Sequence, residues 1–131
     1  MKTIEQDIIK AIRERKHLRT GKASGSGYAQ MQGLTGYRDS LKWDRASGCF
    51  MYHLWGNLIF HKTGLHSVTV SDCGYATPTT VSRINAIFAA LDIPITASVR
   101  KGRTVYFSPY IQQGEELKDC VDLAGWHITL G

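Results

Sequence analysis

Residues 72–91, DCGYATPTTVSRINAIFAAL, constrain the fold more than any other stretch of this chain, because they join the end of a strand pattern to the start of a helix. The alternating segment HSVTVSD ends there, and Gly74 follows at a turn. Thr77 or Thr79 can cap the helix. Pro78 suits its first turn, because backbone N–H groups there have no partner within the helix and proline lacks one. The apolar residues that follow recur at helical spacing, namely Val81, Ile84, Ile87, Phe88 and Leu91. This stretch therefore predicts a helix that packs one side against a sheet.

Three β-rich segments precede this helix, and a hairpin follows it. The first three begin near Cys49, Asn57 and His66, and the short links between them predict a meander. After the helix, the segment ITASVRKGRTVYF predicts a hairpin with Lys-Gly at its tip. A short helix is expected over residues 115–123, and the segment WHITL predicts one more strand.

The N-terminal part of the chain has a helical pattern followed by weaker signals. Thr3 can cap a first helix over residues 3–17, since isoleucines recur there at helical spacing. Residues 20–28, TGKASGSGY, predict a flexible Gly/Ser loop. Residues 29–48 predict irregular structure with a short strand or turn near residues 37–43. We expect one domain over residues 1–131, with its α+β core at residues 49–131.

The order of these elements predicts the fold class. A helix, three strands, a second helix, a hairpin and a last strand lack the regular βα alternation of a doubly wound fold. We therefore predict an α+β domain with a mostly antiparallel β-sheet, an N-terminal helix and a central helix packed on one face. No apolar run reaches the roughly 18 residues of a membrane span. The three cysteines lack any CxxC pairing, which favours reduced thiols over a disulfide or zinc framework, and we expect no metal or other cofactor.

The basic residues are clustered, and the formal net charge is +5. Six of them follow one another and are opposed only by Glu14: Lys10, Arg13, Arg15, Lys16, Arg19 and Lys22. A second group, Arg100, Lys101 and Arg103, surrounds the expected hairpin tip, whereas residues 115–122 are mainly acidic. Two interpretations stay open. The acidic segment folds against the basic helix and neutralises it, or the basic surface binds an anionic partner.

Aromatic residues offer a second indication of a binding surface. Tyr28, Tyr37 and Trp43 lie beside the basic region, where such side chains stack on unpaired bases or anchor a protein interface. We expect Arg83 and Asn85, on the central helix, to face a partner or solvent. A further aromatic and apolar group is expected in the core, namely Phe50, Tyr52, Leu54 and Trp55.

Two His-x-Thr triplets are the strongest catalytic candidates. His61 and Thr63 form the first, and His127 and Thr129 form the second. The pair resembles the active site of 2H phosphoesterases, a resemblance that implies two histidines acting as general acid and base while the hydroxyls hold phosphate oxygens. However, Thr63 runs directly into Gly64, and a three-residue motif arises readily by chance. We therefore favour a protein that is not an enzyme.

A longer resemblance covers roughly the middle 60 residues of the sequence. Its motifs are Gly-Asn-Leu-Ile at residues 56–59, Gly-Tyr-Ala-Thr at residues 74–77, Thr-Thr-Val-Ser-Arg-Ile-Asn-Ala at residues 79–86 and the Lys-Gly hairpin. They resemble a family of small accessory proteins of tailed bacteriophages. The resemblance implies a phage protein in the bacterial host cytoplasm and carries over no catalytic residues.

Together, these features predict a non-enzymatic phage accessory protein that binds an anionic partner, nucleic acid above all, through its basic surface. The alternative is an inhibitor that places the same surface on an acidic host or defence-system protein. The 2H phosphoesterase is the third hypothesis.

Overall fold

A computed structural model describes residues 3–22, 37–111 and 115–131. The chain forms two helices and nine strands within these ranges. In chain order they are α1 (Ile4–Arg13), β1 (Leu18–Lys22), β2 (Tyr37–Asp44), β3 (Cys49–Leu54), β4 (Asn57–Gly64), β5 (Ser67–Val70), α3 (Pro78–Ala90), β6 (Thr96–Arg100), β7 (Arg103–Phe107), β8 (Cys120–Leu123) and β9 (Trp126–Leu130).

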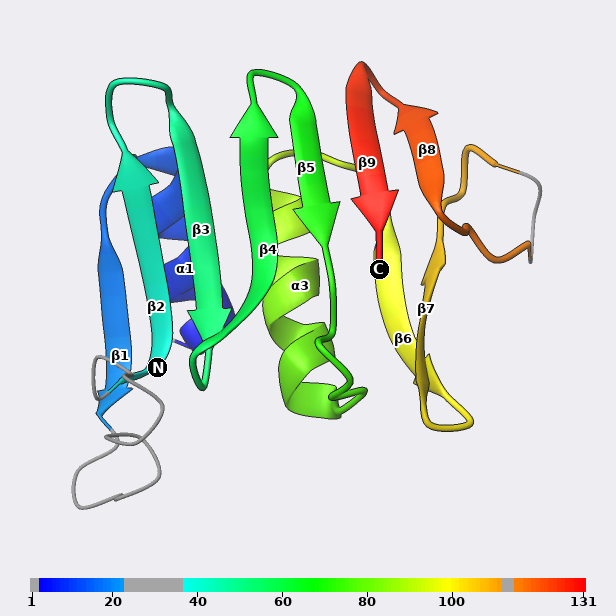
Figure 1. Cartoon of the computed structure of the whole chain (residues 1–131), viewed down its shortest axis with the longest axis horizontal. Coiled ribbons are helices and arrows are strands. Elements are labelled where there is room, and N and C mark those ends of the chain that lie inside the picture. The colour runs from blue at the N-terminus through cyan, green and yellow to red at the C-terminus, as the bar shows by residue number, and fades with distance from the viewer. Residues whose placement is uncertain (1–2, 23–36, 112–114) are drawn as a thin grey trace.

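Seven strands form one sheet in the order β1-β2-β3-β4-β5-β9-β8, and β6 and β7 form a separate hairpin (Figure 1). Every neighbouring pair in the large sheet is antiparallel except β5 and β9, which are parallel. The predicted meander β3-β4-β5 and the predicted hairpin are confirmed. The predicted α+β class with a mostly antiparallel sheet is also confirmed.

The two helices and the β6–β7 hairpin form a second layer on one face of the sheet (Figure 1). Helix α1 packs on α3, and α3 packs on β4 and β6. The side chain of Asn85 joins helix to hairpin, because its amide donates to the Ala97 carbonyl (2.9 Å) and accepts from the Ala97 N–H (2.7 Å). The core between the layers includes Phe60 and Phe88, whose rings meet edge to face at 5.3 Å. Asn85 is therefore a structural residue, which corrects the expectation that it faces a partner or solvent.

The predicted start of α3 is confirmed in detail. Thr77 has an extended backbone, and its hydroxyl accepts from the Thr80 N–H at 3.2 Å. Pro78 occupies the first turn. The middle of the expected apolar stripe, Ile84 to Phe88, is buried against the sheet.

Replacing Thr77 with alanine should lower the free energy of unfolding by about 1 kcal/mol, the usual cost of a lost helix N-cap. Urea denaturation measures the change. Thr79→Ala is the matched control, because Thr79 is an exposed threonine two residues after the cap and should change stability by no more than about 0.5 kcal/mol. Equal effects of the two substitutions would contradict this assignment of the cap.

The first helix is shorter than the 3–17 range predicted from the sequence. Thr3 caps it through a capping box with Gln6, as expected for its start, but it ends at Arg13. Arg15 has a positive φ of 54°, which no helix interior tolerates. The polar residues 13–17 contain no glycine or proline that would indicate the end of the helix at Arg13.

Three further segments differ from the sequence-based expectation. The start of the predicted Gly/Ser loop, Thr20 to Lys22, belongs to strand β1, and residues 23–28 lie outside the described residues. The short strand expected near residues 37–43 is the full strand β2, so the sheet extends well before residue 49. The helix expected over residues 115–123 is wrong: Leu117 forms a bridge with Tyr106, and Cys120–Leu123 is strand β8.

Candidate functional site

Basic side chains meet at the end of the molecule where β2 turns into β3. Arg15, which follows α1, and Arg45, in the β2–β3 turn, line one hollow of about 240 Å³ together with Trp43 and Gly48. The two arginines are thirty positions apart in the sequence, and the sheet brings them together by pairing β1 with β2. The indole N–H of Trp43 is buried and finds no acceptor among the described residues.

Several cations of this region carry no acidic partner. Among the described residues, no carboxylate lies within ion-pair distance of Arg15, Arg19, Lys42 or Arg45. Lys16 contacts only its neighbour Glu14 at 3.7 Å, and both side chains are well exposed. Exposed, unpaired cations repel one another, so this surface favours an approaching anion.

Not every predicted member of the basic surface is available. Arg13 lies against the end of α3, where it contacts Asp92 (3.7 Å) and the Ala89 carbonyl (3.5 Å). It therefore complements the partial negative charge of that helix end. Lys10 is exposed in the last turn of α1. Lys22 belongs to β1, but its side chain lies outside the described residues.

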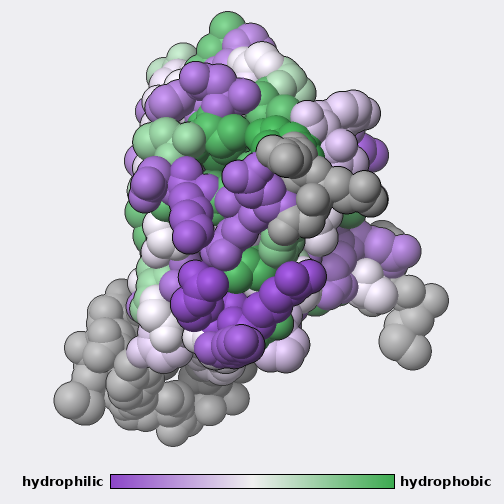
Figure 2. All heavy atoms as spheres, turned by 90° about the vertical axis from the view of Figure 1, so that its right-hand side faces the viewer, coloured by the Kyte–Doolittle hydropathy of each residue, from purple (hydrophilic) through white to green (hydrophobic). Residues whose placement is uncertain are grey.

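The second basic group is held far from the first. Arg100, Lys101 and Arg103 lie at the β6–β7 turn, whereas the β2–β3 turn is at the opposite end and opposite side of the molecule (Figure 1). Arg103 pairs with Glu116 at 3.3 Å, and the Arg100 guanidinium lies 4.6 Å from the ring centre of Phe107. Seen from the β8 side, hydrophilic side chains gather over the lower part of the surface, at the height of the β6–β7 turn (Figure 2). The structure therefore does not combine the two basic groups into one patch.

The acidic segment does not neutralise the basic helix. Within the part of the chain that the structure describes, the only ion pairs of residues 115–122 are Arg103–Glu116 and His127–Asp122. Strand β8 forms the edge of the sheet opposite to β1. The interpretation of an internally compensated N-terminal surface is therefore wrong for the described residues.

Two tryptophans differ from the prediction in opposite ways: the one expected at the surface is buried, and the one expected in the core is exposed. Trp43 is buried in the core beside Phe50 and is 8% exposed, so it cannot serve as the predicted surface contact. Trp55, expected in the core, is 47% exposed at the β3–β4 turn. Tyr37 is half-buried in β2, and Tyr28 lies outside the described residues.

A buried ionic network lies between the sheet and α3. Asp39, completely buried on β2, accepts hydrogen bonds from Tyr52 Oη (2.7 Å), Arg83 Nε (2.8 Å) and Arg38 Nε (2.7 Å). Arg83 is 6% exposed, which corrects the expectation that it faces a partner or solvent. Arg83 Nη2 adds a longer fourth bond (3.4 Å), so each carboxylate oxygen accepts two hydrogen bonds, and this is the condition under which a buried charge is tolerated.

This network fixes the ionisation of its members. Burial by itself would raise the pKa of Asp39, but the hydrogen bonds from Arg83, Arg38 and Tyr52 outweigh burial and hold that pKa below its ordinary value of 3.8. Burial would lower the pKa of Arg83, and the bond to Asp39 reverses the effect and raises it. Burial and the adjacent Asp39 charge both raise the pKa of Tyr52. All three groups keep one charge state near neutral pH.

The two His-x-Thr motifs lie on the face of the sheet that the helices leave uncovered. His61 pairs in register with Thr69, and Thr69 pairs with Thr129, so cross-strand neighbours place both motifs on one face. Strand β5 separates them. His127 contacts Asp122 at 2.7 Å and lines a hollow with His66, whereas the hollow lined by His61 contains none of those residues. The two histidines therefore line separate hollows, not the shared cleft that a phosphoesterase needs.

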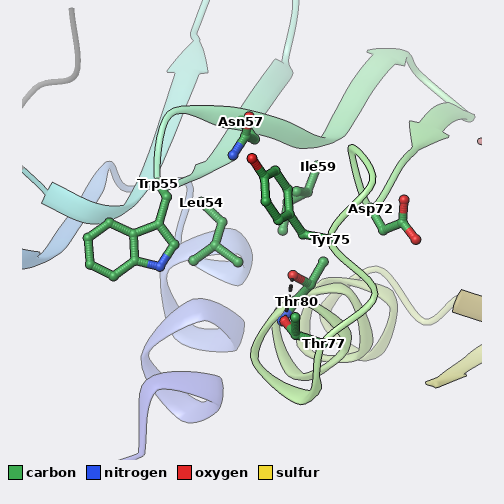
Figure 3. Close-up of a pocket in the computed structure, with 8 residues that line it drawn as sticks. All are labelled: Leu54, Trp55, Asn57, Ile59, Asp72, Tyr75, Thr77 and Thr80. Atoms are coloured by element: carbon green, nitrogen blue, oxygen red, sulfur yellow. Dashed lines mark hydrogen bonds between the residues drawn. The ribbon is translucent and has the colours of Figure 1, made fainter. Parts of the chain in front are cut away.

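Another cavity, of about 320 Å³, lies at the N-terminal end of α3 (Figure 3). We call it the aromatic pocket; its lining residues are Leu54, Trp55, Asn57, Ile59, Asp72, Tyr75, Thr77 and Thr80. They come from the end of β3, the β3–β4 turn, the start of β4, the β5–α3 loop and the first turn of α3. Trp55 and Tyr75 are half-exposed at its mouth.

The sequence analysis missed some members of the basic surface and of the aromatic pocket, for identifiable reasons. Lys42 and Arg45 flank Trp43 and Asp44 in the segment KWDR, and a count of charges over β2 would have found them. Trp55 and Tyr75 each stand beside a glycine at a turn, which is a sign of exposure. Trp55 and Tyr75 reach the same pocket only because the strands pair, and no short stretch of the sequence indicates this.

Comparison with known proteins gives a family. The model of the Kyanoviridae Gp96 protein family matches residues 1–119. No curated protein and no solved structure matches the chain. Within the described residues, no helix is long and apolar enough to span a bilayer. The match covers most of the chain, and this protein belongs to the Kyanoviridae Gp96 family of bacteriophage proteins.

Proposed function

We propose that this phage protein binds the phosphate backbone of nucleic acid through one basic surface. This surface, the basic corner, consists of Arg15, Lys16, Arg19, Lys42 and Arg45. The observation that carries the proposal is the hollow shared by Arg15 and Arg45, two exposed arginines without an acidic partner among the described residues. A guanidinium fork suits phosphate oxygens, to which it donates two parallel hydrogen bonds.

The distribution of charge supports a polyanionic partner. Residues 10–62 contain ten Lys and Arg but three Asp and Glu, and one of those acids, Asp39, is buried. Residues 63–131 contain five basic and six acidic residues. The molecule is therefore electrically asymmetric, and its positive end would be steered toward a polyanion.

The basic corner differs in composition from a typical protein interface. Protein interfaces are usually anchored by large aromatic side chains in desolvated pockets. The exposed aromatic residues Trp55 and Tyr75 lie beyond the other end of β3, whereas the corner presents guanidinium and ammonium groups. This difference favours nucleic acid over an acidic host or defence-system protein, which remains the alternative.

The double substitution Arg15→Glu, Arg45→Glu tests the proposal. We expect it to weaken binding of a labelled oligonucleotide at least about tenfold in fluorescence anisotropy at low salt, because two phosphate contacts become repulsive. The slope of log affinity against log salt concentration should fall by about two, roughly one per lost contact. Thermal melts confirm that the variant is folded.

The matched control is Arg100→Glu, Lys101→Glu, which changes the charge equally at the other end of the molecule. It should retain most of the affinity. Equal losses in the two variants would indicate non-specific attraction and contradict a binding site at the basic corner. A wild-type protein that binds neither DNA nor RNA at 50 mM salt would reject nucleic acid as the partner.

A further inference from the structure

The aromatic pocket has an exposed rim that folding alone does not explain. Trp55 and Tyr75 are 47% and 53% exposed, and in Figure 3 Leu54 lies between their two rings. Leu54 and Ile59 are themselves buried and form an apolar floor. Two aromatic rings over an aliphatic floor leave π faces and apolar surface in contact with water, at a cost in free energy that a flat apolar ligand would relieve.

The backbone at Trp55 is strained in a way that presents its ring. Trp55 and Gly56 form the β3–β4 turn and have positive φ angles of 51° and 79°. Turns of this kind prefer Asn, Asp or Gly at both positions, and a bulky residue there is uncommon. The Lys101-Gly102 and Ala124-Gly125 turns share these positive φ angles, so the feature that sets this turn apart is the large ring that it carries. The turn holds the indole at the mouth of the pocket, although asparagine would suit the backbone conformation of this position better.

The pocket also contains polar groups that the protein leaves free. Among the described residues, neither the side-chain amide of Asn57 nor the hydroxyl of Tyr75 has a hydrogen-bond partner. In Figure 3 these two groups point toward one another across the upper part of the pocket. The hydroxyls of Thr77 and Thr80, by contrast, are 3.1 Å apart and serve the helix cap. An amide side chain can donate and accept at once, which suits the edge of a heterocyclic ring.

The buried ionic network supports this pocket from behind. Asp39 is the register partner of Leu54, and Arg83, one turn after Thr80, ties α3 to Asp39. The backbone N–H of Trp55 donates to the backbone carbonyl of Arg38 at 2.7 Å. The β3–β4 turn is thus tied to β2 next to Asp39, and α3 is tied to Asp39 itself, so the pocket is formed before any ligand arrives.

From this geometry we infer that the aromatic pocket binds a single nucleobase, as a free nucleoside or nucleotide or as an unpaired base of a strand. Its volume of about 320 Å³ is at the lower end of the range of ligand sites, roughly 300–1,000 Å³, and suits one small ring system. The base would stack on Trp55 or Tyr75 and present its edge to Asn57. Stacking on aromatic side chains accepts every base because each has a π face.

The part of this inference that concerns an unpaired base within a nucleic-acid strand rests on the proposed function. Strand β2 connects the two sites, since Arg38 lies beside the Trp55 turn and Arg45 follows the other end of the strand. Eight residues of strand span roughly 23 Å at about 3.3 Å per residue. A single strand that crosses the basic corner would reach the pocket within a few nucleotides, with Lys42 and Arg38 along its path.

The experiment has two arms. In the first, nucleosides and nucleoside monophosphates are titrated while tryptophan fluorescence is recorded, at 50 mM and 500 mM salt. We expect saturable quenching that persists at high salt for the uncharged nucleosides and is lost in Trp55→Phe. In the second, a short single-stranded oligonucleotide is titrated into wild type and into Trp55→Ala, Tyr75→Ala and Asn57→Ala.

Loss of one stacked base should weaken binding by roughly 5–150-fold in Trp55→Ala or Tyr75→Ala. Tyr110→Ala, which removes a 77% exposed tyrosine that does not line the pocket, is the control and should leave affinity unchanged. Oligonucleotide binding that depends on the basic corner but not on Trp55 or Tyr75 overturns this inference and leaves the proposed function standing. Nucleoside binding at the pocket, combined with full oligonucleotide affinity in the basic-corner variant, supports the pocket and rejects the proposed function. Absence of saturable binding by any nucleoside or oligonucleotide overturns both.

Discussion

Replacing Asp39 with alanine is expected to lower the free energy of unfolding by about 3–5 kcal/mol, the usual cost of removing one partner from a buried ion pair. The substitution leaves Arg83 buried at 6% exposure without its counter-charge and leaves the Tyr52 hydroxyl without its acceptor. Urea denaturation followed by circular dichroism measures the loss. Asp122→Ala is the matched control, because that carboxylate is 83% exposed and its contact with His127 should contribute no more than about 1 kcal/mol.

The same carboxylate predicts a dependence of stability on pH. The pKa of Asp39 is lower in the folded than in the unfolded chain, so the unfolded chain binds its proton more readily. The stabilisation is therefore complete above the unfolded value, about 4, and is lost as the pH falls toward the folded value. Asp39→Asn should remove this part of the acid dependence. A loss below about 1 kcal/mol in Asp39→Ala, or an unaltered acid profile in Asp39→Asn, would contradict the ionic network.

Phe88→Ala is expected to destabilise the protein by about 3–5 kcal/mol, because it leaves a cavity where α3 packs on the sheet. The ring of Phe88 is 1% exposed and packs edge to face on Phe60, which stacks in turn on Phe50. Thermal and urea denaturation measure the change. Tyr110→Ala is the control, since this ring is 77% exposed and contributes little buried area. Comparable stability of Phe88→Ala and wild type would contradict the packing of α3 on the sheet.

The sequence predicted those elements whose signals are local. The cap at Thr77, the proline after it and the apolar stripe of α3 are all contained within one short segment. The alternation in β5 and the Lys-Gly turn between β6 and β7 are equally local. Periodicity and turn chemistry therefore gave the class of the fold and the helix on one face of the sheet.

The elements that were missed depend on distant partners. The β1 segment LRTGK has no alternation, and it is a strand because β2 pairs with it. The composition of the acidic segment around Leu117 suggests a helix, yet its backbone bonds go to Tyr106 and β9. Tertiary pairing overrides intrinsic propensity in both places.

The candidate sites illustrate the same limit. A lone arginine on a helix predicts a solvated face, and only the position of Asp39, 44 residues earlier in the chain, shows why Arg83 is buried. The basic N-terminal residues were recognisable from charge alone, but their grouping with Arg45 required the β1–β2 pairing. The aromatic pocket joins a turn, a loop and a helix start that no periodicity connects.

The parallel pairing of β5 with β9 has a consequence for how the protein is made. Val70 and Leu130 are register partners, although α3, β6, β7 and β8 are synthesised between them. At about 5–20 residues per second, the ribosome needs roughly 3–12 s to cover that interval. During this time the β5 edge of the nascent meander is unpaired and can template an unwanted strand from another chain. The β5–β9 junction closes only after β9 has left the ribosome, so the seven-stranded sheet is completed late, and rapid closure limits the time in which the β5 edge is exposed.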